Sequence, residues 1–292
     1  NRGSRAGNRE KCACSWHGMA QSQQWEKAVA DLRGFDVSVT LFGSRNYGLS
    51  HEGSDVDLLT SMPLKRLQQD VLDQVPAQFK VLEAPSVKTK PAPRLLLLHL
   101  QSGVEVDVVS RWSSDIFVRE RDQLMQLMLS FDTRVLEFMR LATDWVRLNQ
   151  EPNMWPNAYA CRLLALHFLM TRFTGPLLPP LREHGCYLEV EHPTYISLKK
   201  QIAASPEELL QEWMRRLMQL ESKGLYASLR HPYEEGQGPN ASKCIIFDPA
   251  DNEPIFKVPW QRMGSVVAAA KREFEKMQQQ QALLAATLAS QS

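Results

Sequence analysis

Two short stretches of the sequence place three aspartates where they could hold metal ions. In LFGSRNYGLSHEGSDVDLL (41–59), Asp55 and Asp57 are separated by one residue, and in SGVEVDVVS (102–110), Asp107 lies in an alternating apolar pattern. Side chains at positions i and i+2 of a strand point to the same face, so Asp55 and Asp57 project together. If the strand that carries Asp107 pairs beside them, three carboxylates converge, and converging carboxylates repel one another unless a cation neutralises them. Mg²⁺ binds such oxygens, and two metal ions about 3.5–4 Å apart form the usual clamp for in-line displacement at phosphorus.

The pattern around these aspartates is more specific than a D-x-D sequence, which is also compatible with ordinary solvent-facing strand residues. An apolar strand leads into Gly43 and Ser44, and a polar loop and S-D-x-D-L follow before the later apolar strand with its central aspartate. Glycine supplies backbone freedom for a tight turn. Ser44 brings a hydroxyl and an N–H group to the place where a phosphate tail would lie.

FGSRNYGLSHEGSDVDL resembles the terminal uridylyltransferases and the related atypical poly(A) polymerases, which belong to the DNA polymerase beta-type nucleotidyltransferase superfamily. The residues that carry the resemblance are Phe42, Gly43, Ser44, Gly48, Leu49, Ser54, Asp55, Asp57 and Leu58. The resemblance implies an α+β fold: a nucleotidyltransferase palm, which is a mixed sheet with helices, followed by a mostly helical poly(A)-polymerase-like domain. The nucleotide cleft is expected between the two.

The resemblance also implies a mechanism and a set of partners. Asp55 and Asp57 would bind two Mg²⁺ or Mn²⁺ ions, Asp107 would bind the ion that activates the 3′-hydroxyl, and Gly43 and Ser44 would hold the triphosphate. The expected reaction is template-independent addition of nucleotides to a single-stranded RNA 3′ end. UTP is favoured by the form G-L-x-x-x-G-S-D-φ-D, and ATP, as in a poly(A) polymerase, is the alternative.

The helical half departs from the family pattern at phosphate-binding positions. Arg121 and Asp122 stand where the family has Asn with Ser or Thr, so Arg121 is expected to meet a phosphate and Asp122 to repel one. Alignment on Trp145 places Thr143 and Arg147 at the positions of two phosphate-binding lysines, so one cation is kept and one is lost. For Arg147, a solvated helix charge is an equal alternative.

Further candidates for nucleotide contacts lie in two later motifs. Ala158 and Tyr159 match a Ser-Tyr pair at the start of a buried helix, with Asn157 as a substitute for the serine hydroxyl and a core tyrosine as the alternative for Tyr159. Asp248 and Asp251 in FDPAD match acids that accept hydrogen bonds at the base edge. Carboxylates only accept, so they suit a donor such as uracil N3–H or adenine N6–H₂. The histidine that often follows and favours UTP is missing.

A chain of 292 residues exceeds a comfortable single core, so more than one domain is expected. We predict a leader or transit-like segment over 1–18, a palm over 19–117 and a helical domain over 118–292.

Hydrophobic periodicity and turn residues predict the secondary structure. Strands are expected at 36–42, 54–60, 79–82, 94–100, 104–109 and CIIF (244–247), and helices at 20–33, 64–75, 156–173, from Ser205 and from about Trp260. A loop is predicted over 223–242, and the Gln tract at 278–281 is predicted to be a frayed helix end.

Composition restricts the partners and leaves two other functions open. The net charge of +1 gives no field that attracts nucleic acid, so RNA binding must be local or supplied by a larger RNA-processing complex. The same charge argues against a 2′-5′ oligoadenylate or cyclic dinucleotide synthase, and the weakened phosphate contacts motivate a catalytically silent scaffold subunit. Five scattered cysteines without a C-x-x-C pair indicate a reducing, intracellular setting, cytoplasmic or mitochondrial. No apolar run of about 18 residues predicts a membrane span.

Overall fold

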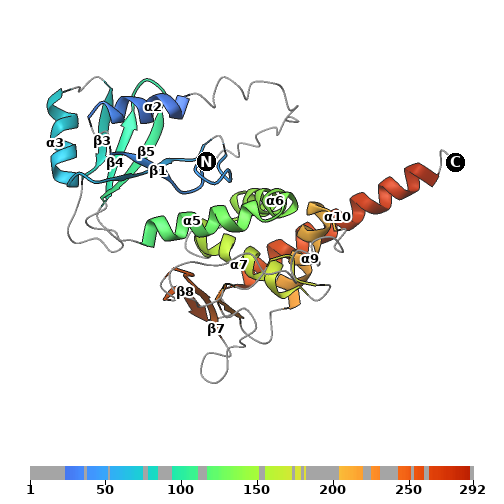
Figure 1. Ribbon diagram of the computed structural model, residues 1–292. Coiled ribbons are helices and arrows are strands. Elements are labelled where there is room, and N and C mark those ends of the chain that lie inside the picture. Colours follow the sequence, from blue (N-terminus) through green and yellow to red (C-terminus); the bar gives the residue numbers. More distant parts are fainter. Residues whose placement is uncertain are drawn as a thin grey trace, which may run out of the picture. The chain divides into compact units, whose positions relative to one another are not determined.

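The computed structural model has two compact units, and each is described by itself (Figure 1). The first comprises Asn1–Arg45 and Ser50–Asp115, and the second comprises Asn46–Leu49 and Ile116–Ser292. The four residues Asn46–Leu49 therefore belong to the second unit although both their neighbours belong to the first. The structure describes residues 24–35, 38–51, 53–74, 78–84, 94–110, 117–150, 155–172, 175–178, 181, 204–219, 225–230, 243–250, 253–259 and 263–289.

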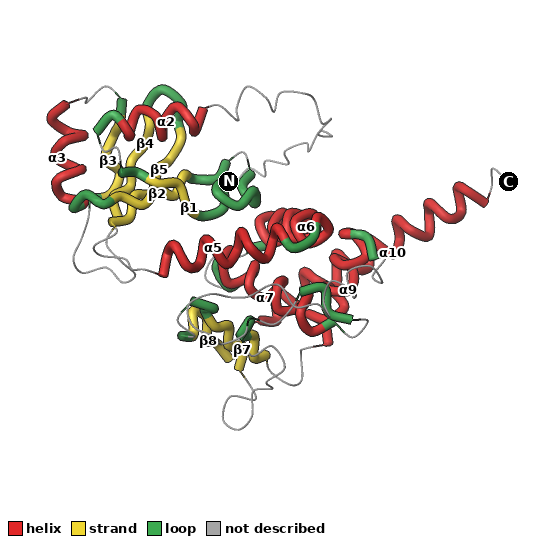
Figure 2. Tube along the Cα trace, in the orientation of Figure 1, coloured by secondary structure: helices red, strands yellow, loops and turns green. Residues whose placement is uncertain are grey.

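The first unit is a five-stranded mixed sheet with two helices (Figure 2). Its strands are β1 (Thr40–Phe42), β2 (Val56–Thr60), β3 (Phe79–Glu83), β4 (Arg94–His99) and β5 (Val104–Ser110), and its helices are α2 (Gln24–Arg33) and α3 (Leu64–Gln74). The order across the sheet is β1-β2-β5-β4-β3. The strands β2 and β5 pair in parallel, and every other neighbouring pair is antiparallel.

Alternation along the strands divides this sheet into a covered face and a face that carries the aspartates. On β5, Val106 and Val108 are fully buried while Asp107 between them points to the other face, and β2 alternates in the same way at Val56, Asp57 and Leu58. The buried residues form one core with apolar residues of both helices, Ala28, Val29, Leu32, Leu64, Leu67 and Val71. Both helices therefore pack on the same face, and the aspartates project from the opposite one.

The second unit is mostly helical. It contains the helices α5 (Phe117–Ser130), α6 (Thr133–Asn149), α7 (Ala158–Thr171), α9 (Pro206–Gln219) and α10 (Gly264–Ala289), and the strands β6 (Leu225–Ala227), β7 (Lys243–Phe247) and β8 (Pro254–Pro259). The strand β7 pairs in parallel with β6 and antiparallel with β8. Helix α7 is buried on nearly all sides, as its continuous apolar sequence predicts, so it is the central helix of this unit.

Side-chain caps fix where several of these helices begin. Asp132 accepts a hydrogen bond from the backbone N–H of Arg134 at the start of α6. At the start of α9, Ser205 and Glu208 form the reciprocal capping box that the sequence predicts, with distances of 2.7 and 3.2 Å. Each cap satisfies backbone N–H groups that have no partner inside the helix.

The α+β fold class is confirmed, whereas several element boundaries differ from the prediction. Strand β1 begins only at Thr40, and the helix that contains the Gln tract continues to Ala289, so the predicted frayed end at 278–281 is wrong. Glutamine has a good helix propensity and the following Ala-Leu-rich residues extend the helix. Strand β6 lies inside the predicted loop 223–242, and β8 was not predicted because proline occupies both its ends. None of the described helices is both long and apolar enough to cross a membrane.

Candidate functional site

Two of the three aspartates are direct neighbours across parallel strands. Asp57 on β2 is the register partner of Asp107 on β5, and Asp55 immediately precedes β2. Neighbouring strands are about 4.7–4.9 Å apart, so the two carboxylates leave the same face at adjacent positions. Asp55 is exposed, Asp57 is half-buried, and the Asp107 side chain is only 14% exposed. The sheet thus brings together Asp57 and Asp107, and Asp55 lies two residues before Asp57 in the chain.

The turn after β1 holds its backbone directly against Asp57. Gly43 has a φ of +74°, a conformation that residues with a Cβ rarely adopt. A Cβ added at Gly43 would overlap the Asp57 side chain, with only 2.9 Å to Cγ. Phe42 is the register partner of Asp57, so β1 places the turn beside this carboxylate, and Ser44 is buried next to it. Glycine is therefore required here both by its backbone angle and by the closeness of Asp57.

Arg45 fixes the loop that carries Asp55, a role that the sequence analysis did not assign. Its Nε donates a hydrogen bond to the backbone carbonyl of Asp55 at 3.0 Å, and its Nη2 donates to the carbonyl of Ser54. The guanidinium also lies over the Trp25 ring, 5.4 Å from the centroid. Burial lowers the pKa of Arg45, while Asp55 and Asp57 act in the opposite direction. Arg45 therefore joins the Gly-Ser turn to the S-D-x-D segment.

Arg94 on β4 is a second unassigned cation of this face. Its Nη1 donates to Asp107 Oδ2 and its Nη2 to Glu83 Oε2, both at 3.1 Å. The other oxygen of Asp107, Oδ1, is buried and has no hydrogen-bond partner among the residues that the structure describes. Burial raises the pKa of the Asp107 carboxyl; Arg94 opposes this rise, and the charges of Asp55 and Glu83 add to it. Asp107 is thus an incompletely compensated carboxylate.

The binding of metal ions by Asp55, Asp57 and Asp107 remains a prediction. In the part of the chain that the structure describes, no three His, Cys, Asp or Glu side chains are gathered as a metal ion would need. Arg94 engages one oxygen of Asp107, and mutual repulsion keeps uncompensated carboxylates apart. The residue types nevertheless fit a hard divalent cation, because the donors are all carboxylate oxygens on or next to paired strands. In the described part of the chain, Asp107 Oδ1 also lacks a hydrogen-bond partner.

The predicted nucleotide contacts at Arg121 and Asp248 lie in the second unit, where they pair with each other. The Arg121 guanidinium forms an ion pair with Oδ2 of Asp248, which is fully buried. Oδ1 of Asp248 accepts a hydrogen bond from the backbone N–H of Ala250 at 2.9 Å. Asp251 lies outside the described residues. Asp248 thus holds the turn after β7 through its hydrogen bond with Ala250, and Arg121 compensates its charge.

The remaining candidates have structural contacts of their own. Arg147 is half-exposed and pairs with Asp144 at 3.6 Å. Asn157 is the N-cap of α7, and its Oδ1 accepts from the N–H of Ala160 at 2.8 Å. Tyr159 packs against the hydrophobic core of the second unit. Asp122, expected to repel a phosphate, instead accepts a hydrogen bond from the Asn46 side chain.

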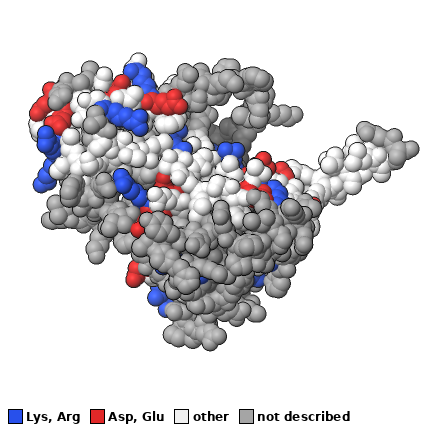
Figure 3. All heavy atoms as spheres, viewed as in Figure 1, with Lys and Arg blue, Asp and Glu red and all other residues white. Residues whose placement is uncertain are grey.

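Charges of both signs are interspersed on the visible face of the described residues (Figure 3). Lysines and arginines alternate with acidic residues over the first unit rather than forming one continuous basic area. This distribution agrees with the net charge of +1. On this face, any attraction of a polyanion depends on individual residues.

The family comparison agrees with the geometry of the first unit. Residues 23–124 match the family model described as a nucleotidyltransferase domain. This part of the chain is a nucleotidyltransferase domain. It includes all five palm candidates, Gly43, Ser44, Asp55, Asp57 and Asp107. A comparison with curated protein sequences gave no significant match.

Solved structures extend the similarity beyond the nucleotidyltransferase domain. The structure of mtPAP in its apo form has a TM-score of 0.67 at 18% identity, over 88% of this chain and 65% of that chain. The complex of mtPAP with UTP gives 0.64 at 19% identity, over 85% and 61%. The Cid1 poly(U) polymerase gives 0.66 at 14% identity, over 88% of each chain. The fold is that of these polymerases, as the sequence resemblance implied, and the chain spans less than two thirds of the length of the mtPAP chains.

Proposed function

We propose that this protein is a template-independent nucleotidyltransferase that extends the 3′ end of single-stranded RNA and uses UTP in preference to ATP. The observation that carries the proposal is the pairing of Asp57 with Asp107 on adjacent parallel strands, with the Gly43 backbone packed against Asp57. This arrangement places carboxylate oxygens beside the turn that the sequence resemblance assigns to the phosphate tail. The fold is shared with Cid1, whose structure is described with RNA terminal uridylyl transferase activity, and this supports the RNA terminus as the acceptor.

The proposed reaction gives a task to each of the five palm candidates. Asp55 and Asp57 would hold both divalent ions, and Asp107 would hold the ion that activates the 3′-hydroxyl. When bound, the ions supply Lewis acidity at the attacking and leaving oxygens. Gly43 and Ser44 orient the phosphate tail. The protein otherwise contributes by positioning and electrostatic stabilisation, because phosphoryl transfer requires little covalent chemistry from it.

The choice of base depends on residues of the second unit. Solved complexes of mtPAP are described with UTP, with GTP and with ATPγS, so this fold accommodates several bases. In this chain, Asp248 has one oxygen bound to the Ala250 N–H and the other paired with Arg121. A base contact at Asp248 would therefore compete with Arg121. The preference for UTP rests on the G-L-x-x-x-G-S-D-φ-D form of the palm motif alone.

The test is primer extension of a short single-stranded RNA with Mg²⁺ or Mn²⁺ and each of the four nucleoside triphosphates separately. We expect the longest products with UTP; longer products with ATP would assign the protein to the poly(A) polymerases. Joining of ATP into short oligomers without the primer would indicate an oligonucleotide synthase. Asp57→Asn should abolish extension, whereas Asp73→Asn, which changes an exposed acid of α3, should leave it unchanged. Extension that survives Asp57→Asn contradicts the catalytic assignment.

The Arg94 ion pair favours a second candidate, a catalytically silent subunit of an RNA-processing complex. A guanidinium already bound to Asp107 neutralises part of the charge that would otherwise attract a metal ion. Binding of Mn²⁺ to the protein, measured by electron paramagnetic resonance, distinguishes the two. We expect binding that is lost in Asp57→Asn; no binding, together with no extension by any nucleotide, would favour the silent subunit.

A further inference from the structure

The four residues between the Gly-Ser turn and S-D-x-D, Asn46–Leu49, are held by the second unit. Leu49 is buried in the hydrophobic core of that unit, and Tyr47 packs against the same core. At both ends the segment continues directly into the first unit, at Arg45 and at Ser50. We call Asn46–Leu49 the anchor loop. It belongs to the palm motif in sequence, whereas its side chains pack with the helical unit.

Side chains of α5 and α6 bind the anchor loop by hydrogen bonds. On α5, Asp122 accepts from the Asn46 side chain, and Gln126 donates to the Asn46 carbonyl at 3.4 Å. On α6, Arg140 Nε donates to the Gly48 carbonyl at 3.2 Å. Because Asp122 is only 8% exposed, its hydrogen bond is screened little by solvent, and hydrogen bonds to a charged group are roughly twice as strong as neutral ones. The contact between Asn46 and Asp122 is therefore the main polar contact of the loop.

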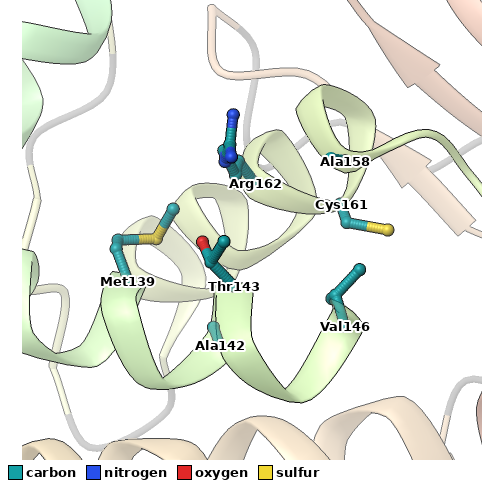
Figure 4. A pocket seen from close by; sticks show the side chains of 7 residues that line it. All are labelled: Met139, Ala142, Thr143, Val146, Ala158, Cys161 and Arg162. Atoms are coloured by element: carbon teal, nitrogen blue, oxygen red, sulfur yellow. The ribbon is translucent and has the colours of Figure 1, made fainter. Parts of the chain in front are cut away.

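The third helix, α7, holds Tyr47. Figure 4 shows Arg162 on α7, where it lines a small hollow together with Thr143 of α6. Arg162 Nη1 donates a hydrogen bond to the Tyr47 hydroxyl at 3.0 Å, and its guanidinium lies 5.7 Å from the centre of the Tyr47 ring. A guanidinium near an aromatic ring is attracted by it. One arginine thus binds Tyr47 through both the hydroxyl and the ring.

The residues on either side of the anchor loop connect it to the aspartates of the palm. Arg45, directly before the loop, donates to the backbone carbonyls of Ser54 and Asp55. After the loop, the His51 carbonyl accepts from the Ser54 N–H and the His51 N–H donates to Ser54 Oγ, both at 3.0 Å. A shift of the anchor loop therefore moves the Gly-Ser turn through the chain and the Asp55 segment through these hydrogen bonds.

From these contacts we infer that the anchor loop is the element by which the helical unit positions the palm motif, with Asn46 and Asp122 as the main positioning pair. The pair acts through the Gly-Ser turn and the segment before Asp55. Asp122 stands where the family resemblance places a nucleotide contact, and in this chain its carboxylate binds the loop. The consequence for catalysis rests on the proposed function, whereas the anchoring itself does not.

Hydrogen–deuterium exchange of the full chain, measured by mass spectrometry on peptides from 43–55, tests the anchoring. Asn46→Asp places two carboxylates side by side, and they repel each other. Exchange in 43–55 should become roughly 10–100-fold faster, the range expected for the loss of a hydrogen bond to a charged group, while exchange in α7 stays within about twofold. Adding Asp122→Asn reverses donor and acceptor and should restore most of the protection. Asp122→Asn alone keeps a carbonyl acceptor for Asn46 and should change exchange by less than about threefold.

The rate of primer extension tests the positioning. Asn46→Asp should lower kcat roughly 10–100-fold, since a misplacement of about 1 Å at a reacting centre costs on the order of 10²-fold. The reversed pair, Asn46→Asp with Asp122→Asn, should recover most of this loss, a rescue that a general loss of stability does not predict. Asn149→Asp is the matched control, because it removes the hydrogen bond from Asn149 to the Trp145 carbonyl at 2.9 Å on α6. It should leave kcat and exchange in 43–55 within about twofold of the unmodified protein.

Each outcome decides the inference. Unchanged exchange in 43–55 of Asn46→Asp would overturn the anchoring, and faster exchange with an unchanged rate would overturn the positioning role. If exchange also becomes faster throughout α6 and α7, the reversed pair decides: restored protection supports the anchoring, and protection that is not restored overturns it. If the exchange results are as expected but the unmodified protein adds no nucleotide to any primer, the anchoring stands, and the positioning role fails together with the proposed function.

Discussion

The contact between Gly43 and Asp57 gives the sharpest quantitative prediction. A Cβ at Gly43 would lie 2.9 Å from Cγ and 3.1 Å from Cβ of Asp57, whereas carbon atoms in ordinary contact are about 3.5–4.0 Å apart. In Gly43→Ala, the Asp57 side chain must therefore move by roughly 0.5–1 Å. A displacement of about 1 Å at a reacting centre costs on the order of 10²-fold in rate. We expect Gly43→Ala to lower the rate of nucleotide addition by roughly 100-fold.

Gly103→Ala is the matched control for this variant. Gly103 lies in the turn between β4 and β5, its φ of +69° is close to the +74° of Gly43, and a Cβ there would meet nothing within 4 Å. Both variants place alanine in the left-handed region, which costs about 1–2 kcal/mol. Both should therefore lose stability in urea denaturation, Gly43→Ala by more because it also displaces Asp57, while only Gly43→Ala loses activity. Equal activity of the two variants would refute the argument that Gly43 is required by the closeness of Asp57.

Three further predictions concern the charged groups. Burial raises the folded-state pKa of Asp107 above its ordinary 3.8, so the metal-free protein loses stability as the pH rises through the folded-state pKa. Asp107→Asn should therefore raise Tm at pH 7 in EDTA, with a difference that disappears toward pH 4. A lower Tm at pH 7 would contradict this. Arg121→Met should cost about 1–3 kcal/mol in urea denaturation because it removes the ion pair of buried Asp248, and adding Asp248→Asn should recover part of the loss. No recovery would show that the ion pair is not the cause. Arg45→Met should lower the rate of primer extension roughly tenfold, since it releases the loop before β2 from the Gly-Ser turn. An unchanged rate would exclude a positioning role.

The sequence predicted the aspartate face of the sheet because local rules determine most of it. The i, i+2 spacing of Asp55 and Asp57 and the apolar alternation around Asp107 follow from strand geometry. Which strand pairs with which depends on long-range packing, and the direct register of Asp57 with Asp107 became visible only in the structure. The glycine at position 43 was predicted from the turn it permits, but its contact with Asp57 was not.

The arginines were harder to predict because their partners are distant in the sequence. Arg94 meets Asp107 across two antiparallel strands, and Arg162 meets Tyr47, which lies 115 residues earlier. Nothing in the local pattern distinguishes these arginines from solvated charges. Arg121 and Asp248 were each expected to contact a nucleotide, whereas the structure pairs them with each other, an arrangement that no spacing rule anticipates. Asn157 was expected to contact the nucleotide and is a helix cap, which its position before a helix could have indicated.

The assignment of Asn46–Leu49 to the helical unit has a consequence for synthesis of the chain on the ribosome. These four residues separate the Gly-Ser turn from S-D-x-D, yet Gly48 and Tyr47 find their partners at Arg140 and Arg162, 92 and 115 residues later. At about 5–20 residues per second, those partners are translated on the order of 5–20 s after the loop. When the first unit leaves the ribosome, Tyr47 and Gly48 therefore still lack these contacts. The contacts form only after the second half of the protein has been made.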